Sequence, residues 1–279
     1  MIERHFLGLA PSGFHRVAYT EWPGPPGGRT AICVHGLTRN GRDFDRLAAS
    51  LSATHRVVCP DVAGRGRSEW LGSAEEYGYP LYLADMTALI ARLGAAEVDW
   101  IGTSMGGLIG MMMAAQKATP VRRLVINDIG PFVAKAGLER IGAYVGKDPG
   151  FAGLAELEAY LRRVHAPFGP LADAEWAHLA AHGGRTKPDG TLGLAYDPRI
   201  GAPFEGEQKD VALWPVWDAI RCPTLVLRGA ESDLLRREDA LAMTERGPRA
   251  RLVEFPGIGH APALMAADQI EAIRGFLAG

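Results

Sequence analysis

The motif Gly102-Thr-Ser104-Met-Gly106 has the residue types and spacing of a turn that carries a nucleophilic serine. An apolar run typical of a strand, residues 98–101, comes directly before it, and a helical stretch of small residues follows. Glycines two positions before and after the serine let strand and helix approach closely and leave the hydroxyl uncrowded. Free N–H groups at the start of such a helix also favour negative charge beside it. The motif therefore predicts that Ser104 is a nucleophile.

A serine nucleophile needs a base within hydrogen-bond reach of its hydroxyl, and His260 fits best. It follows a late strand in the run Gly257-Ile-Gly259-His260, whose glycines let the imidazole reach across the sheet. The other seven histidines lie in or beside early strands (His5, His15, His55), in the loop after a strand (His35), or in the middle of the chain (His165, His178, His182).

The acid that orients the base should follow a late strand and precede the histidine. Asp233, five residues beyond an expected strand, meets this requirement, and the order Ser, Asp, His is one of the known triad orders. Two alternatives stay open. Glu231 shares the loop of Asp233, and Asp128 follows the preceding expected strand, residues 123–126.

Two backbone N–H groups are the expected oxyanion donors. His35-Gly36-Leu37 comes directly after the strand 29–34, and ligands bind at the carboxyl ends of strands in such sheets. The N–H of Leu37 and that of Met105, which follows the nucleophile, would face the same oxygen. His35 itself, one residue before the donor turn, is interpreted as a structural loop residue.

The elements that must position these residues alternate between strand and helix. Such alternation indicates parallel strands joined by helical crossovers, with helices on both faces of an α/β sheet. The first residues, 5–9 and 14–20, fit a leading antiparallel pair. The expected strands are 29–34, 56–60, 98–101, 123–126, 224–228 and 251–255, and the expected helices are 42–52, 81–93, 105–116, 237–245 and 261–277.

The alternation stops between residues 131 and 213, where helical pieces surround a segment rich in glycine and proline, residues 183–203. We expect this insertion to be a mainly helical cap, with residues 1–130 and 214–279 forming the core. The residues proposed to line a substrate pocket beneath it are aromatic, although core packing is the alternative for each: Phe132, Phe168, Trp176 and Trp214.

Composition narrows the possible partners. The 279 residues carry a formal net charge of −2, which does not suggest binding to nucleic acid or to an anionic membrane. No apolar stretch reaches the roughly 20 residues of a membrane helix, and no signal peptide is evident, which predicts a cytoplasmic location. The cysteines Cys33, Cys59 and Cys222 read as small core residues. No cysteine or histidine pair was identified with zinc-ligand spacing, so no metal is predicted.

These motifs resemble the α/β-hydrolase superfamily. The resemblance rests on His35-Gly36, on the D-x-x-G-x-G-x-S loop at 61–68, on the Gly-Thr-Ser-Met-Gly-Gly elbow at 102–107, and on the loops that hold Asp233 and His260. The elbow is similar to those of small bacterial carboxylesterases, enol-lactonases, carbon–carbon bond hydrolases and cofactor-free haloperoxidases. Some family members carry the acid after the strand before the cap, which is the position of Asp128. An α/β-hydrolase fold, a mostly parallel central sheet with an inserted cap, is implied.

The resemblance implies a serine hydrolase that cleaves a small carboxylic ester or lactone through an acyl-enzyme, with no cofactor. One alternative is a carbon–carbon bond hydrolase, which normally needs an arginine to bind a substrate carboxylate. A non-catalytic ligand receptor on the same fold is a further alternative. The sequence makes no prediction of oligomeric state. The arginines considered for carboxylate binding are Arg39, Arg162, Arg163 and Arg185.

Overall fold

The computed structural model describes residues 1–279 and is built around one eight-stranded sheet. Its strand order is β1-β2-β4-β3-β5-β6-β11-β12, and from β4 to β12 neighbouring strands run parallel. The α/β architecture expected from the sequence is confirmed. The strands are β1 (Ile2–Ala10), β2 (Gly13–Trp22), β3 (Arg29–Val34), β4 (His55–Pro60), β5 (Val98–Thr103), β6 (Val121–Asn127), β11 (Thr224–Gly229) and β12 (Arg251–Phe255).

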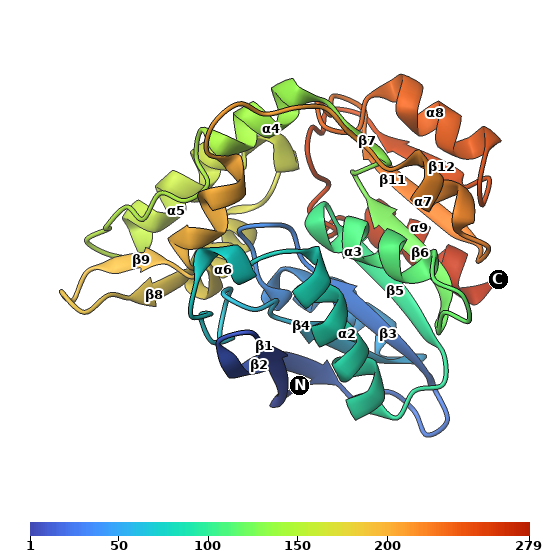
Figure 1. Cartoon of the computed structure of the whole chain (residues 1–279), viewed down its shortest axis with the longest axis horizontal. Coiled ribbons are helices and arrows are strands. Elements are labelled where there is room, and N and C mark those ends of the chain that lie inside the picture. The colour runs from blue at the N-terminus through green and yellow to red at the C-terminus, as the bar shows by residue number, and fades with distance from the viewer.

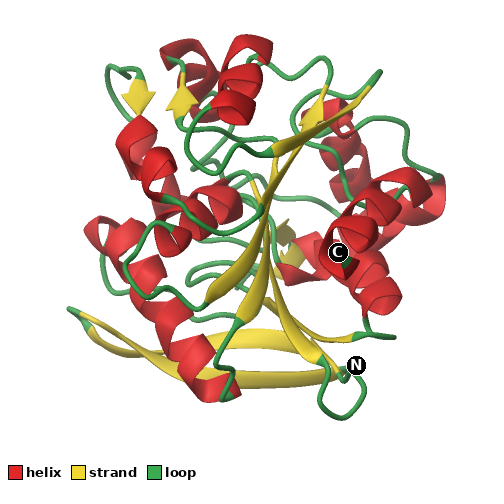
Figure 2. Cartoon of the chain, turned by 90° about the vertical axis from the view of Figure 1, so that its right-hand side faces the viewer, coloured by secondary structure: helices red, strands yellow, loops and turns green.

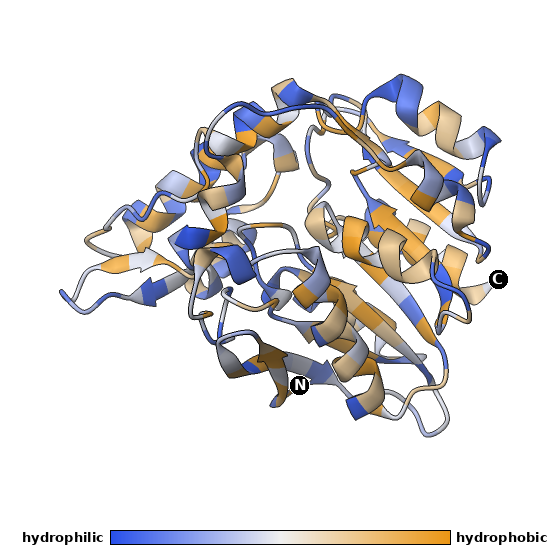
Figure 3. Ribbon diagram, viewed as in Figure 1, coloured by the Kyte–Doolittle hydropathy of each residue, from blue (hydrophilic) through white to orange (hydrophobic).

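Helices cover both faces of the sheet, which is seen edge-on in Figure 2. One apolar core includes buried residues of α2, α3, α7 and α8, and a second core on the other face includes those of α1 and α9. Because helices bury both faces, the central strands are apolar along almost their whole length (Figure 3). The helices are α1 (Asp45–Leu51), α2 (Tyr79–Leu93), α3 (Met105–Ala114), α7 (Trp214–Ala219), α8 (Arg237–Glu245) and α9 (Ala267–Ala278).

The sheet begins with an antiparallel hairpin, β1 and β2, as the sequence suggested, although both strands are longer than expected. Another difference lies near the C-terminus. The last helix was expected from residue 261 but begins at Ala267, because residues 261–266 form a loop at the end of β12. No helix of the structure has both the length and the apolar character required to cross a lipid bilayer.

Between β6 and α7 the chain leaves the sheet. The helices α5 and α6 and the short hairpin β8–β9 lie together, away from α7, α8 and α9 (Figure 1). The sequence analysis missed α4 and the hairpin. The elements of the insertion are β7 (Phe132–Val133), α4 (Lys135–Gly142), α5 (Leu154–Val164), α6 (Asp173–Gly183), β8 (Gly184–Thr186), β9 (Leu192–Leu194) and β10 (Val211–Ala212), with 3-10 turns at 166–168 and 198–204.

The two ends of this insertion meet. Val133 pairs with Val211 and Phe132 with Ala212 in the antiparallel strands β7 and β10. The chain therefore leaves the core and returns to it at the same place, and we interpret residues 131–213 as the cap.

Candidate active site

Ser104 lies on a sharp turn between β5 and α3. Its φ of 52° is in the left-handed region that a non-glycine residue rarely adopts. The two flanking positions must be glycine because there is no space for a side chain. A Cβ on Gly106 would lie 2.0 Å from the carbonyl oxygen of Val34, and one on Gly102 would lie 2.1 Å from the carbonyl oxygen of Gly106. Close packing of helix against strand therefore holds the serine in this conformation, as the motif predicted.

His260 lies directly beside Ser104. Its Nε2 is 3.0 Å from Ser104 Oγ, although 156 residues separate the two in sequence. The loop after β12 carries the imidazole over the sheet edge, and Gly257 in that loop has a φ of 70°. The structure thus places the predicted base within hydrogen-bond reach of the predicted nucleophile.

The carboxylate beside His260 belongs to Asp128. Its Oδ2 lies 2.8 Å from Nδ1 of His260 and also accepts a hydrogen bond of 2.6 Å from the Ser232 hydroxyl. Its Oδ1 accepts the Gly229 N–H at 2.8 Å. Asp128 is fully buried, and these three bonds fix its orientation. These contacts form a hydrogen-bonded chain in which Asp128 orients the imidazole and His260 can take the proton of the Ser104 hydroxyl.

The expectation that Asp233 orients His260 is not met by the structure. The Asp233 carboxylate is 51% exposed and forms an ion pair with Arg140 of α4, with Nε at 2.5 Å and Nη2 at 3.0 Å. The loop after β11 instead turns Ser232 inward, toward Asp128. Glu231, the other alternative in this loop, is exposed.

The expected oxyanion donors belong to two residues that border Ser104. The Leu37 N–H makes no hydrogen bond within the protein, and Met105 is the first residue of α3, where N–H groups lack helical partners. A Cβ on Gly36 would lie 3.7 Å from the Ser104 Cβ, so the Leu37 turn borders the nucleophile.

The buried ring of His35 holds the turn that contains Leu37. Its Nε2 accepts the Val62 N–H at 2.9 Å and its Nδ1 lies 2.7 Å from the Gly36 carbonyl oxygen. Burial lowers the pKa of His35 to about 4, so the ring is neutral near pH 7. The interpretation of His35 as a structural residue fits these contacts.

Two cavities meet at Ser104, and Leu37 and Ile141 also line both. The first, here called the polar pocket, has a volume of about 70 Å³, and the second, the apolar pocket, has about 270 Å³. Residues of the cap line both pockets. Side chains with polar groups in the polar pocket include Thr38, Arg39, Asp43, Arg140, Tyr144, His165 and His260. The apolar pocket contains Tyr77, Tyr79, Tyr82, Leu108, Leu138 and Phe204 among others.

Of the four aromatic residues expected to line a pocket beside the serine, only Phe168 does so. Trp176 is buried within the cap, while Phe132 and Trp214 lie beneath the guanidinium groups of Arg236 and Arg246. These three predictions were wrong because each of these rings packs elsewhere, Trp176 inside the cap and the other two against arginine side chains. The tyrosines at 77, 79 and 82 were missed, although Tyr79 and Tyr82 lie in the first turn of α2 and Tyr77 comes just before it.

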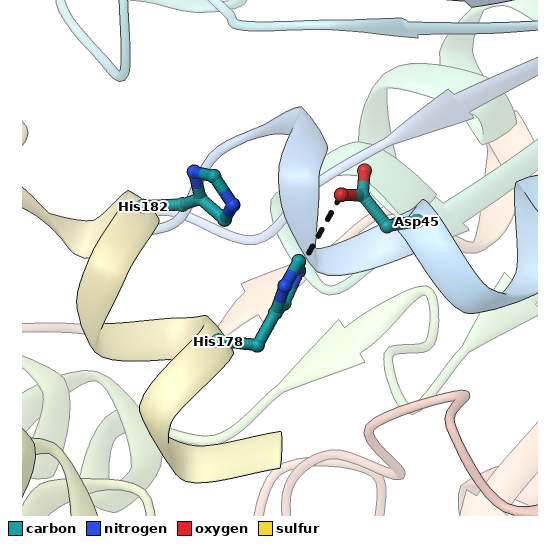
Figure 4. A group of neighbouring side chains, drawn as sticks. All are labelled: Asp45, His178 and His182. Carbon is teal, nitrogen blue, oxygen red and sulfur yellow. Dashed lines mark ion pairs between the residues drawn. The ribbon is translucent and has the colours of Figure 1, made fainter. Parts of the chain in front are cut away.

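One further cluster joins the cap to the core. His178 and His182, one turn apart on α6, face Asp45 of α1 (Figure 4). The expectation that no histidine pair has metal-ligand spacing was wrong, since one ligand atom from each of the three residues lies within 4.8 Å of the others. Arg42 already places a positive charge beside two of these residues. Its Nη2 donates to Asp45 at 2.5 Å and its Nη1 lies 3.5 Å from His182 Nδ1.

Comparisons with known proteins find hydrolases that are similar to this chain. A family model described as the alpha/beta hydrolase family matches residues 31–273. A 3-hydroxybutyrate-oligomer hydrolase from Cupriavidus necator is 47% identical, covering 97% of this chain and 96% of its own. A 2-(acetamidomethylene)succinate hydrolase from Mesorhizobium japonicum is 28% identical over 84% of this chain and 82% of its own. Among solved structures, an α/β hydrolase from Novosphingobium aromaticivorans superposes with a TM-score of 0.89 at 36% identity, covering 99% and 98% of the two chains.

Proposed function

Because this chain belongs to the α/β hydrolase family, we propose that it is a serine hydrolase that cleaves small carboxylic esters, and that its substrates are short oligomers of a 3-hydroxy acid such as 3-hydroxybutyrate. The observation that carries the hydrolytic part is the chain of hydrogen bonds from Asp128 through His260 to Ser104 Oγ. The relative from Cupriavidus necator supports the substrate class, since the identity extends over nearly the full length of both chains.

The chemistry has two stages. His260 Nε2 takes the Ser104 proton as Oγ attacks the ester carbonyl carbon, and the carbonyl oxygen becomes an oxyanion that accepts the Leu37 and Met105 N–H groups. The bond from that carbon to the alcohol oxygen then breaks, and His260 returns the proton to the departing oxygen. In the second stage His260 takes a proton from water as the water oxygen attacks the acyl carbon. The bond from that carbon to Ser104 Oγ then breaks, His260 returns the proton to Oγ, and the acid leaves. Asp128 holds the imidazole throughout.

The two pockets support a substrate that extends on both sides of the scissile bond. An oligoester has an acyl part and an alcohol part, and cavities on two sides of Ser104 accommodate one each. Residues 131–213 act as the cap that closes both cavities, since Ile141 of α4 borders each of them. A single small ester with a bulky group on one side would leave one cavity empty.

The test compares wild-type protein with Ser104→Ala on p-nitrophenyl butyrate and on the linear trimer of 3-hydroxybutyrate, with Ser73→Ala as a surface control. We expect Ser104→Ala to lose at least about 10³-fold in kcat/KM on both substrates, because the nucleophile is gone. Equal turnover by wild type and Ser104→Ala would refute the serine mechanism. Turnover of the activated ester but not of the trimer would refute the substrate class, and lactones and diketo acids in the same panel identify the replacement.

A further inference from the structure

His260 distinguishes the two pockets chemically. It lines the polar pocket together with Ala261 and Pro262, and it is absent from the lining of the apolar pocket. The group that returns the proton must lie next to the oxygen that leaves. The departing alcohol therefore occupies the polar pocket, and the acyl group that stays on Ser104 occupies the apolar pocket.

The two pockets also differ in charge. No Asp, Glu, Lys, Arg or His side chain lines the apolar pocket, whereas Arg39, Arg140 and Asp43 line the polar one. Arg39 is buried, and its Nε and Nη2 bind the two oxygens of Asp43 at 2.8 and 2.7 Å. Its Nη1 makes no hydrogen bond with the protein and lies beside Gly183, where a Cβ would be 3.3 Å from it, so this nitrogen can still donate to a ligand.

A second donor lies beside this guanidinium. His165 lines the polar pocket, and its ring stacks on Phe168 with centroids 4.6 Å apart. Burial, followed by the charges of Arg39 and His260, lowers the pKa of His165 well below its usual value. Its neutral ring makes no hydrogen bond to another side chain and can bind either an acid group or a hydroxyl.

We propose that the polar pocket binds the carboxylate of the departing hydroxy acid through Arg39, so that the enzyme removes units from the carboxyl end of the oligomer. This proposal rests on the function proposed above. An oligomer of a hydroxy acid carries its only charge at that end, and the alcohol released there is a free hydroxy acid. The smaller volume of the polar pocket, about 70 Å³ against about 270 Å³, fits a short departing unit and a longer acyl part.

The experiment uses the linear dimer of 3-hydroxybutyrate as the free acid and as its carboxamide, which has nearly the same shape but no charge. Both contain the same scissile ester. Wild-type protein should prefer the acid by at least about tenfold in kcat/KM, since a charge-assisted hydrogen bond is lost with the amide. In Arg39→Gln/Asp43→Asn, which removes both charges of the pair together, the preference should fall to within about twofold of one. Arg163→Gln, an exposed cap arginine outside both pockets, is the matched control.

The order of release gives a second measurement. A trimer that carries a benzoyl group on its hydroxyl end should first yield the benzoylated dimer and free monomer. Early release of benzoylated monomer, or a wild-type preference for the amide, overturns the proposal, and so does a preference that survives in the double variant. Each of these outcomes still requires Ser104-dependent turnover, so they differ from a failure of the proposed function, in which no ester is cleaved.

A different observation concerns Arg65, which is fully buried and has no carboxylate partner. Its Nη1 donates to the Ala63 carbonyl oxygen at 2.7 Å and to the Tyr82 hydroxyl at 2.9 Å. The guanidinium carbon lies 5.1 Å from the centre of the Tyr82 ring. These neighbours satisfy hydrogen bonds and offer a cation–π contact, but they do not neutralise the charge.

Arg65 contacts both residues expected to supply the oxyanion donors. Its Nε donates to the Leu37 carbonyl oxygen at 2.9 Å, and its Nη2 lies 3.7 Å from Met105 Sδ. We infer that Arg65 is a positioning residue that holds the Leu37 turn. Its uncompensated charge also stabilises the oxyanion, because electrostatic interactions are strong in the buried interior of a protein.

Arg65→Met and Arg65→Lys test this role on p-nitrophenyl butyrate and with butylboronic acid, which forms an anionic tetrahedral adduct with the serine. Arg65→Met should lower kcat at least about tenfold with little change in KM, and should weaken the boronate by a similar factor, since both depend on the charged tetrahedral state. Arg65→Lys keeps the charge but loses the bond to Leu37, and should lower kcat by at least about threefold. Arg274→Gln on α9 is the control. Unchanged kcat in the lysine variant, or boronate affinity unchanged in a folded methionine variant, overturns the inference.

Discussion

The Asp128 carboxylate lies 2.8 Å from the Nδ1 atom of His260, at the ends of two strands that are separated in the sheet by β11 alone. The intervening strand contributes as well, because the Gly229 N–H and the Ser232 hydroxyl both donate to Asp128. Three strand ends thus converge on one buried carboxylate. The contact assigns the orienting role to a residue that the sequence analysis kept only as an alternative.

Asp128→Asn should lower kcat by roughly 10³ to 10⁴-fold, because an amide cannot hold the imidazole in the tautomer that accepts the serine proton. The matched variant is Asp233→Asn, which breaks an exposed ion pair with Arg140 and should leave kcat within about twofold of wild type. Initial rates on p-nitrophenyl butyrate measure both. A severe loss in Asp233→Asn with normal activity in Asp128→Asn would reverse the assignment.

Gly106→Ala should destabilise the fold by at least about 2 kcal/mol, since its Cβ would have to displace backbone at the Val34 carbonyl oxygen. Gly275→Ala in α9 provides the opposite control. No atom lies within 4 Å of the Cβ position there, so the better helix propensity of alanine should stabilise by about 0.5–1 kcal/mol. Urea unfolding gives both values, and equal effects at the two positions would contradict the packing argument.

Stability should fall as the pH drops from about 6.5 toward 4. Burial lowers the pKa of His35 to about 4, and that of His165 is also well below 6.5. Between the folded and the unfolded pKa, the unfolded chain binds protons that the folded chain excludes. The stabilisation is therefore complete above the unfolded pKa of about 6.5 and is lost as the pH falls below it. The loss is up to about 1.4 kcal/mol per pH unit for each histidine. Urea unfolding at several pH values in this range gives the free energy of unfolding at each pH. That free energy should change less steeply with pH in His165→Gln than in wild type. An identical slope would exclude His165 as a contributor.

Leu138→Trp should shorten the preferred acyl group. Leu138 of α4 lines the apolar pocket, and an indole there would fill space that a long acyl chain requires. The ratio of kcat/KM for p-nitrophenyl octanoate to that for the acetate should fall at least about tenfold. Leu154→Trp, at an exposed position on α5, is the control. If the ratio changes equally in both variants, the apolar pocket does not hold the acyl group.

The position of the serine and the histidine could be predicted from the sequence because the relevant signals are local. Gly102 and Gly106 bracket Ser104 between a strand and a helix, and the glycines before His260 follow a strand. Parallel strands bring their carboxyl ends to one edge of the sheet, so correct assignment of the strands already placed both residues at that edge.

The choice of acid was decided by tertiary structure. Neighbouring strands β6 and β11 each carry an aspartate after their carboxyl ends. No local pattern in the sequence shows which of the two side chains turns toward the imidazole. Asp128, directly after β6, is buried by the loops around it, whereas Asp233 lies further along its loop and reaches solvent and Arg140. The pockets depended on tertiary structure for the same reason. Their walls combine residues of the cap with tyrosines of α2, and no local pattern records which distant segments share a cavity.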